Sequence, residues 1–296
     1  MQKSGFVNII GQPNVGKSTL MNNLLGEKMS IITSKPQTTR HRILGIYNDD
    51  EHQVIFSDSP GLISDPAYAM HASLNKFAYS SFQDADIIIF LLDPFESYEE
   101  DAKVIELLKQ AEVPKYLVLN KIDLDKADLI SALNEKWNEI VNFDHTFLIS
   151  ALTGDGVDEL RTQILNDLQE GPAYYPKDQL SDKNVRFFVS EMVRESILEQ
   201  YKQEIPYSCE VAIDEYKESE KNGKPFAHIY GTIFVDRKSQ KSILIGKGGS
   251  AIKKMSTSAR AKIEEFVGHP IYLEMNVKVR ENWRNDERQL KYFGYE

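Results

Sequence analysis

Cysteine is nearly absent from this sequence. Cys209 is its single thiol, so no disulfide can form within the chain. Long apolar runs are missing too, since the longest, residues 87–92, is far short of the ~20 residues that span a bilayer. The first residues show no basic segment followed by the apolar core of a secretion signal. We therefore expect a protein of the reducing cytoplasm.

Recognisable metal and hydrolase motifs are also missing. The six histidines, at positions 41, 52, 71, 145, 228 and 269, have no metal-ligand spacing, and no Ser-His-Asp arrangement appears as a motif. Internal repeats and low-complexity tracts are absent from the sequence as well. These absences give no support to a zinc protein, a serine hydrolase or a repeat protein.

Acidic residues outnumber basic ones by 45 to 35, for a formal net charge of −10. The imbalance lies in the first part of the chain: residues 1–179 hold 15 Lys and Arg against 27 Asp and Glu, whereas residues 180–296 hold 20 against 18. Between Asp236 and Glu264 there are eight basic residues and no acidic one. This stretch is a candidate contact for a polyanion, although the chain as a whole is acidic.

At 296 residues the chain is long enough for two domains. From residue 6 to about residue 168, short apolar runs alternate with helical patterns. The strand-like runs are FVNII, VIFSD, DIIIFLLD, YLVLN and TFLIS, and helices are expected from Lys17, near 100–110, near 128–141 and after Gly156. This alternation predicts an α/β domain with a mostly parallel sheet and helices on both faces.

A different pattern follows the segment EGPAYYPKDQL, whose two prolines break the periodicity. A helix is expected over 183–202, and apolar and polar residues alternate over 209–213, 229–235 and 271–279. Three strands with one apolar face indicate a smaller α+β domain. We assign residues 1–170 to the first domain, 171–182 to a linker, 183–280 to the second domain, and 281–296 to a closing helix in which Trp283, Tyr292 and Phe293 are expected to be packing anchors.

The segment GQPNVGKS, residues 11–18, matches the phosphate-loop pattern GxxxxGK followed by Ser or Thr. It lies between a predicted strand and a predicted helix, which argues against the alternative of a coincidental turn. Glycines let backbone N–H groups surround phosphates, and the helix N-terminus favours negative charge. Lys17 would neutralise the outer phosphates, and the Ser18 hydroxyl would bind Mg²⁺. The residues expected at the phosphates are Gly11, Gln12, Pro13, Asn14, Val15, Gly16, Lys17, Ser18 and Thr19.

The segment NKID, residues 120–123, follows the strand YLVLN, at the sheet edge where a nucleotide base would lie. Guanine presents a ring N–H beside an amino group, so the Asp123 carboxylate can accept from both, whereas adenine would leave it unpaired. Such a buried polar pair can favour guanine by about 10⁴. The backbone of the segment SAL would contact the guanine carbonyl. The residues expected at the base are Asn120, Lys121, Asp123, Ser150, Ala151 and Leu152. For NKID alone, an ordinary strand-end turn is the alternative.

Two further segments suit the γ-phosphate side of a nucleotide switch. In DSPG, Asp58 can hold Mg²⁺ through water and the Gly61 N–H can meet the γ-phosphate, although a strand-ending turn is the alternative. The polar stretch QTTRHR suits a loop whose threonine completes the Mg²⁺ shell only when the γ-phosphate is present, and we prefer Thr39 over Thr38. The residues expected at the metal are Ser18, Thr39 and Asp58. The expected catalytic contacts are Lys17, Thr39 and Gly61. Ser59, Pro60 and Leu62 are expected beside the phosphates.

The run SILIGKGGSAIKK lies within the acid-free basic stretch and contains a GxxG loop between two helix candidates. The run resembles the GxxG segment of a KH domain, and that resemblance implies that backbone and a lysine approach a sugar-phosphate chain beside an apolar groove for about four unpaired bases. The glycines matter because side chains there would hold the RNA away. A flexible hairpin is the alternative for GxxG alone. The residues expected to bind RNA are Lys241, Ile245, Gly246, Lys247, Gly248, Gly249, Ile252, Lys253 and Lys254.

The order GQPNVGKS, QTTR, DSPG, NKID, SAL resembles the translation-factor-related GTPases, and QTTRHR together with a C-terminal module similar to a type II KH domain points to the Era family. That family usually has threonine before the proline of DSPG; serine keeps the hydroxyl. The resemblance covers essentially the whole chain. It implies a GTPase that cycles between GTP and GDP with Mg²⁺ and binds the 3′ end of 16S rRNA in the assembling 30S subunit. Similar proteins also associate peripherally with the inner face of the cell membrane, but no amphipathic anchor stands out in the sequence. We expect the protein to be a monomer.

The position after Gly61 carries Leu62, where many small GTPases place a glutamine that orients water. We therefore expect slow intrinsic turnover, resting on phosphate positioning and Mg²⁺. In related GTPases an asparagine at the position of Asn14 helps hold a K⁺ ion; the alternative is a loop residue that bonds its own backbone.

Two rival functions remain open from the sequence. An RNA-binding protein could keep GTP only as a structural ligand, and it would differ from a switch by showing no turnover and no coupling between GTP and RNA. A phosphate-loop kinase is disfavoured by NKID and by the lack of a recognisable lid for an acceptor molecule.

Overall fold

The computed structural model describes residues 2–63, 65–95, 102–124 and 127–295, and the chain divides into two compact units. Unit 1 comprises Met1–Ala67 and His71–Asp182, and unit 2 comprises Tyr68–Met70 and Lys183–Glu296. Within the described ranges, no helix is both long and apolar enough to cross a membrane.

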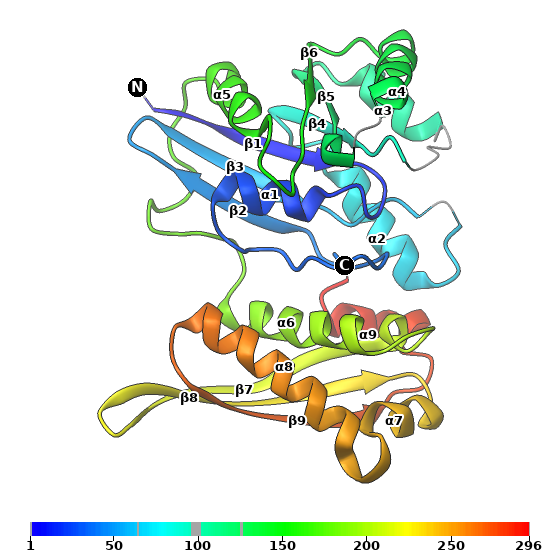
Figure 1. The fold of residues 1–296 in the computed structure, drawn as a ribbon, viewed down its shortest axis with the longest axis vertical. Helices are drawn as coiled ribbons and strands as arrows, with labels where there is room; N and C mark the ends of the chain where they lie inside the picture. The colour runs from blue at the N-terminus through cyan, green and yellow to red at the C-terminus, as the bar shows by residue number, and fades with distance from the viewer. Residues whose placement is uncertain (1, 64, 96–101, 125–126, 296) are drawn as a thin grey trace. The chain divides into compact units, whose positions relative to one another are not determined.

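Unit 1 is built on a six-stranded sheet in the order β2-β3-β1-β4-β5-β6 (Figure 1). Its strands are β1 (Lys3–Ile10), β2 (Ile43–Asn48), β3 (His52–Asp58), β4 (Ile87–Leu92), β5 (Lys115–Leu119) and β6 (His145–Leu148). β2 runs antiparallel to β3, and the other neighbours pair in parallel. The predicted mostly parallel sheet is therefore confirmed.

Helices cover both faces of this sheet (Figure 1). They are α1 (Lys17–Leu25), α2 (Ala69–Ser80), α3 (Ala102–Gln110), α4 (Ala127–Ile140) and α5 (Val157–Asp167). On one face, residues of α2, α3 and α4 join β4 and β5 in one apolar cluster, where the Phe90 and Trp137 ring centroids are 4.8 Å apart. β4 is buried along its whole length, as a parallel strand covered on both faces must be.

Residues 171–182, predicted to be a linker, run along the edge of unit 1. The Gln53 side chain accepts backbone N–H groups of Tyr174 (2.6 Å) and Tyr175 (3.0 Å). The Ser181 hydroxyl donates to the Leu44 carbonyl at 2.6 Å, beside the Gly45–Ser181 bridge. This segment is therefore held by the sheet edge and does not form a free tether.

Unit 2 has a three-stranded sheet in the order β7-β8-β9, with β7 and β8 antiparallel and β8 and β9 parallel. Its elements are α6 (Val185–Gln200), β7 (Cys209–Lys221), β8 (Lys224–Val235), α7 (Lys238–Ile245), α8 (Ser250–Val267), β9 (Ile271–Val279) and α9 (Glu287–Tyr292). Figure 1 shows α6 and α8 on one face of the sheet, and the buried Ile229, Ile233 and Met255 lie in this core. The predicted α+β domain is confirmed.

The closing segment is shorter than predicted, because only Glu287–Tyr292 is α-helical, after a 3₁₀ turn at Trp283–Asn285. Trp283 is fully buried and its indole N–H donates to the Ser208 carbonyl at 3.0 Å. Phe293 packs on Trp283 with ring centroids 5.4 Å apart. Tyr292, however, is 61% exposed, so the expectation that it anchors the packing was wrong.

Candidate functional site

The phosphate loop connects β1 to α1, and two of its residues adopt the left-handed backbone conformation, Asn14 (φ 65°) and Gly16 (φ 104°). A Cβ at Gly16 would come within 2.3 Å of the Asn120 side-chain nitrogen. The glycine is therefore required both by its dihedral angle and by the close approach of the NKID segment. The loop brings backbone N–H groups and the α1 N-terminus to one place, which is an arrangement that binds anions.

Lys17 lies at the first position of α1 and is almost completely buried. Its Nζ donates to the carbonyl oxygens of Gly11 (3.0 Å) and Gln12 (2.6 Å), so the loop itself fixes the ammonium group. These carbonyls are neutral, so they orient the ammonium group without cancelling its charge.

Ser18, Thr39 and Asp58 meet at the end of the loop. The Ser18 hydroxyl donates to Asp58 Oδ2 at 2.6 Å and lies 2.9 Å from the Thr39 hydroxyl, which donates to the same carboxylate oxygen at 3.2 Å. The structure thus brings Thr39 and Asp58 to Ser18, although they lie 21 and 40 residues away from it in the sequence. Hydroxyl and carboxylate oxygens at one point are a donor set suited to Mg²⁺.

Asp58 is completely buried, and burial raises the pKa of its carboxyl group. The hydrogen bond from Ser18 and the charge of Lys17 act in the opposite direction. Among the residues that the structure describes, Oδ1 of Asp58 finds no hydrogen-bond partner. A buried, partly unpaired carboxylate is costly unless a cation compensates it, so the residues fit a divalent ion.

A hollow opens above these groups. It is lined by Pro13, Asn14, Gly16, Lys17, Ser18, Thr19, Ile31, Ile32, Thr33, Gln37, Thr38, Thr39 and Gly61. At its rim a Cβ on Gly61 would lie 2.5 Å from the Pro13 backbone nitrogen, so only glycine fits there. Leu62 does not face this hollow, because its buried side chain belongs to the apolar cluster under the sheet. The predicted contact of Leu62 is thus restricted to its backbone.

The NKID segment is tied to the phosphate loop by Asn120. Its side-chain amide donates to the Val15 carbonyl at 2.8 Å and accepts the Ala151 backbone N–H at 2.8 Å. One buried asparagine therefore connects three of the predicted motifs. Asp123 is exposed, and so is Leu152, whereas Ser150 is buried.

Asp93 is a site residue that the sequence interpretation missed. It is buried at the carboxyl end of β4 and forms an ion pair with Lys121, whose backbone is left-handed at φ 63°. This pair fixes the lysine of NKID. Its sequence signal was an acidic residue directly after a buried strand, at the edge where ligands of parallel sheets bind.

Arg42 was also missed. It follows the QTTR segment, and its guanidinium donates to Ser57 (2.7 Å) and to both carboxylate oxygens of Asp84 (2.6 and 2.9 Å). Bidentate pairs of this kind fix geometry. The arginine therefore anchors the end of the loop that carries Thr39.

The GxxG segment lies between α7 and α8, and three of its glycines have positive φ: Gly246 (71°), Gly248 (60°) and Gly249 (78°). A Cβ at Gly246 would lie 2.6 Å from the Ala251 Cβ, whereas Gly248 and Gly249 face open space. The predicted loop is therefore present and its outer side is accessible to a polymer.

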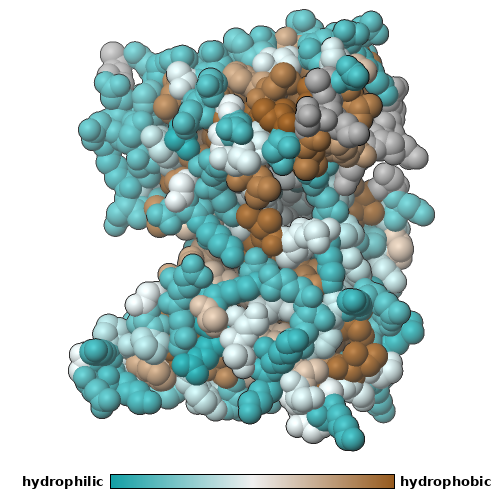
Figure 2. Space-filling model, viewed as in Figure 1, coloured by the Kyte–Doolittle hydropathy of each residue, from teal (hydrophilic) through white to brown (hydrophobic). Residues whose placement is uncertain are grey.

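The side chains around this loop combine charge and apolar surface. Lys247, Lys253 and Lys254 are exposed and Lys241 is half-buried. Figure 2 shows an apolar patch over the α7 end of unit 2. Ile243, which the sequence interpretation did not select, is 52% exposed. The predicted Ile245 and Ile252 are partly exposed.

Two of the eight basic residues in this stretch are neutralised locally. Lys262 pairs with Glu195 (2.8 Å) and Glu199 (2.7 Å) on α6, and Arg260 pairs with Glu264 at 2.9 Å. The positive field is therefore concentrated toward the GxxG loop.

Comparison with known proteins gives two family matches. Residues 6–121 match a family described as 50S ribosome-binding GTPase, and residues 204–284 match the KH domain. The chain is 43% identical over 296 residues to the GTPase Era of Syntrophus aciditrophicus, covering all of this chain and 96% of the relative. It is 45% identical over 296 residues to a chloroplastic ERA-like GTPase of Oryza sativa, covering 99% of this chain and 69% of the relative.

Solved structures agree over the full length. A crystal structure of Era in complex with MgGDPNP and nucleotides 1506–1542 of 16S ribosomal RNA is 38% identical, with a TM-score of 0.92 and coverage of 100% of this chain and 99% of that one. A variant of Aquifex aeolicus Era bound to GDP and AlF4⁻ matches with the same identity and TM-score, covering 99% of each chain.

Proposed function

This chain is a GTPase of the Era family with a C-terminal KH domain, and from that premise we propose that it binds the 3′ region of 16S rRNA and acts in assembly of the 30S subunit. The observation that carries the RNA-binding proposal is the open GxxG loop with exposed lysines beside it. Its dependence on GTP rests on the contact of Thr39, from a loop, with Ser18 and Asp58 at the nucleotide site. Such a contact lets the nucleotide state alter the conformation of a surface loop. In this proposal residues 1–170 form the GTPase domain and residues 183–280 the RNA-binding domain.

In the proposed mechanism, Lys17 and the backbone of the phosphate loop hold the β- and γ-phosphates. Ser18, Thr39 and Asp58 are the residues that would hold Mg²⁺, which would neutralise charge on the phosphate oxygens. The Gly61 N–H would position the γ-phosphate while a water oxygen attacks its phosphorus and the bond to the bridging oxygen breaks. Since the Leu62 side chain is buried away from the site, no side chain at that position orients the water, and we expect slow turnover.

Asn14 is our proposed K⁺ ligand. It is exposed in the hollow, with a left-handed backbone. A monovalent cation there would add positive charge beside the transferred phosphate. GTP hydrolysis should be faster in KCl than in NaCl, and Asn14→Ala should remove that difference; equal rates for the unaltered protein in the two salts would rule out the ion.

For the guanine base, the proposed contacts are Asp123, Asn120 and Lys121, with the backbone of residues 150–152. Asn120 holds the phosphate loop to the Ala151 backbone, and Asp93 fixes Lys121. The exposed Asp123 is the proposed acceptor for the base edge.

The RNA-binding proposal is tested with a single-stranded oligonucleotide from the 16S rRNA 3′ end. Lys247→Ala should weaken binding and reduce the slope of log affinity against log salt by somewhat less than one unit, because one phosphate contact is lost. Lys177→Ala, an exposed lysine of unit 1 outside the basic stretch, is the matched control and should change neither. If Lys247→Ala also changes neither, the GxxG loop is not the RNA site.

We also propose a cytoplasmic location with peripheral contact to the inner face of the membrane. Flotation of the protein with anionic lipid vesicles tests this contact, and recovery only in the unbound fraction would count against it.

A further inference from the structure

The outer face of the unit 2 sheet, opposite α6 and α8, carries an unusual row of rings. In β8 the residues alternate: Ala227 and Ile229 are fully buried toward the helices, whereas Phe226, His228 and Tyr230 are partly exposed on the other face. On the neighbouring strand β9, Tyr272 is paired with His228 and is 45% exposed.

These rings form one continuous strip. The centroids of Phe226 and His228 are 5.1 Å apart, those of His228 and Tyr272 5.8 Å, and those of Tyr272 and Tyr230 6.0 Å. We call these four residues the ring strip. Toward the α9 end of the same face Phe234 is covered by Phe293, with centroids 5.2 Å apart, so the strip ends where α9 begins to cover the sheet.

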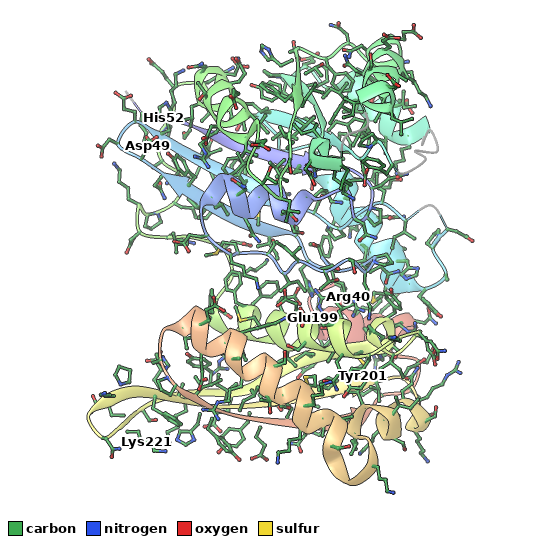
Figure 3. All side chains as sticks on the ribbon, viewed as in Figure 1. Arg40, Asp49, His52, Glu199, Tyr201 and Lys221 are labelled. Carbon is green, nitrogen blue, oxygen red and sulfur yellow. The ribbon has the colours of Figure 1, made fainter. Side chains whose placement is uncertain are left out.

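Charge is sorted between the two faces of the β7–β8 hairpin. Lys217 is paired with His228 on the ring face, and Lys221 lies with its Nζ 5.3 Å from the Phe226 ring. The intervening acids, Glu218 and Glu220, point to the opposite face because strand residues alternate. Figure 3 shows Lys221 at the free end of the hairpin.

The remaining charges on the ring face are divided along the sheet. By the same alternation, Lys224 on β8 and Lys278 on β9 share this face, giving four lysines in all. Acids lie on the rest of this face: Asp214, Glu215 and Glu274 are near Tyr230, and the buried Glu210 is paired with Phe234. Asp214 accepts a hydrogen bond from Thr232 (2.7 Å) and Glu274 accepts one from the Tyr272 hydroxyl (2.9 Å). The excess of lysine is therefore confined to the hairpin end, around Phe226 and His228.

We propose that the ring strip is a second RNA-binding surface, which stacks unpaired bases on Tyr272 and its neighbours while the hairpin lysines contact the phosphates. Aromatic faces flanked by cations bind single-stranded nucleic acid of any sequence. Exposed rings would suit a protein partner too, but lysine is depleted in protein interfaces, so the lysines beside Phe226 and His228 are what favour RNA. The proposal rests on the proposed RNA-binding function.

The strip is separate from the GxxG loop. Figure 1 shows the β7–β8 hairpin at one end of unit 2 and α7, which leads into the GxxG loop, at the other. A KH groove accepts about four bases, so an RNA that reaches both places must be longer than the groove alone requires. The two surfaces therefore predict different dependences on RNA length.

The test uses the full chain and two labelled RNAs: a six-nucleotide strand from the 16S rRNA 3′ end, and an RNA corresponding to nucleotides 1506–1542. Tyr272→Ala should weaken binding of the longer RNA roughly tenfold, the loss expected for one stacked base, and leave binding of the short strand unchanged. Tyr272→Phe should restore the affinity because it keeps the ring. Tyr292→Ala, an exposed tyrosine outside the strip, is the matched control and should bind both RNAs normally.

Other outcomes separate this proposal from the one it rests on. If Tyr272→Ala binds the longer RNA with unchanged affinity, or weakens both RNAs equally, the ring strip is not an RNA surface. If it binds both RNAs normally but sediments less with 30S subunits, the strip contacts a ribosomal protein and the stacking proposal is overturned. If Lys247→Ala has no effect while Tyr272→Ala does, the GxxG assignment fails and the ring strip stands.

Discussion

At the scale of single residues, the carboxylate of Asp58 shows how function and stability conflict. Burial raises its pKa above the ordinary value of 3.8, so the folded chain binds this proton more tightly than the unfolded chain does. The unfolding free energy therefore falls as pH rises above the ordinary pKa, and the ionised group costs stability at neutral pH. The cost is tolerated because the same charge suits a divalent ion.

Asp58→Asn should accordingly stabilise the Mg²⁺-free protein at pH 7, because an amide can still accept from Ser18 without carrying charge. It should also abolish Mg²⁺-dependent GTP hydrolysis. Thermal melts in EDTA at pH 5 and pH 8 check the first point, and the gain should be larger at pH 8. A lower melting temperature for the variant at pH 8 would show that the ionised carboxylate does not cost stability.

Asp123 governs the choice of base in the proposed site. Asp123→Asn replaces an acceptor of two hydrogen bonds with a group that can accept only one and presents an N–H to a donor edge. Competition binding should show the preference for GTP over ATP falling by at least a hundredfold. An unchanged preference would place base recognition elsewhere.

At the scale of elements, the GxxG loop depends on two different glycine requirements. Gly246 has φ 71° and ψ 175°, a region that is essentially restricted to glycine, and it also touches Ala251. Gly248 lies in the ordinary left-handed region with open space around it, where a side chain costs about 1 kcal/mol.

Gly246→Ala should therefore destabilise unit 2 by about 2–4 kcal/mol, and Gly248→Ala by about 1 kcal/mol. Urea unfolding followed by the fluorescence of the buried Trp283, in a Trp137→Phe background, measures both. Equal losses for the two alanine variants would contradict both the backbone restriction at Gly246 and its close contact with Ala251.

The sequence predicted the buried strands and missed two elements of unit 1. Apolar runs such as residues 87–92 are unmistakable because both faces of a central parallel strand are covered. β2 is an antiparallel edge strand directly after the QTTRHR loop, and α2, with the sequence AMHASLNKFAYS, carries a mixed pattern. Neither has the periodicity that separates a strand or a helix from a loop.

The sequence predicted each motif of the site separately, but it did not predict the side-chain contacts that hold the motifs together. The spacing of GxxxxGK and the glycines of GxxG follow from local backbone geometry, which a short segment determines. The ion pair of Asp93 with Lys121 and the anchoring of Arg42 by Asp84 depend on strand order in the sheet. A single sequence does not reveal which strand ends lie side by side, so these partners became visible only in the folded chain.

At the scale of the whole molecule, the charges are divided along the chain. Residues 1–179 carry the acidic excess, and the basic stretch between Asp236 and Glu264 lies in unit 2. An acidic first unit would repel RNA outside the basic stretch and the ring face. The RNA that we propose it binds is therefore a short unpaired segment and not a long duplex.

The proposed protein is a switch only if the bound nucleotide changes its affinity for RNA. One titration tests this coupling: the affinity for an RNA of nucleotides 1506–1542 is measured with Mg²⁺ and either GDP or a non-hydrolysable GTP analogue. We predict tighter binding with the analogue, by at least fivefold, and loss of this difference in Ser18→Ala, where the hydroxyl that joins Thr39 and Asp58 is gone. Equal affinities in the two nucleotide states of the unaltered protein would refute the switch and leave GTP as a ligand that does not control RNA binding.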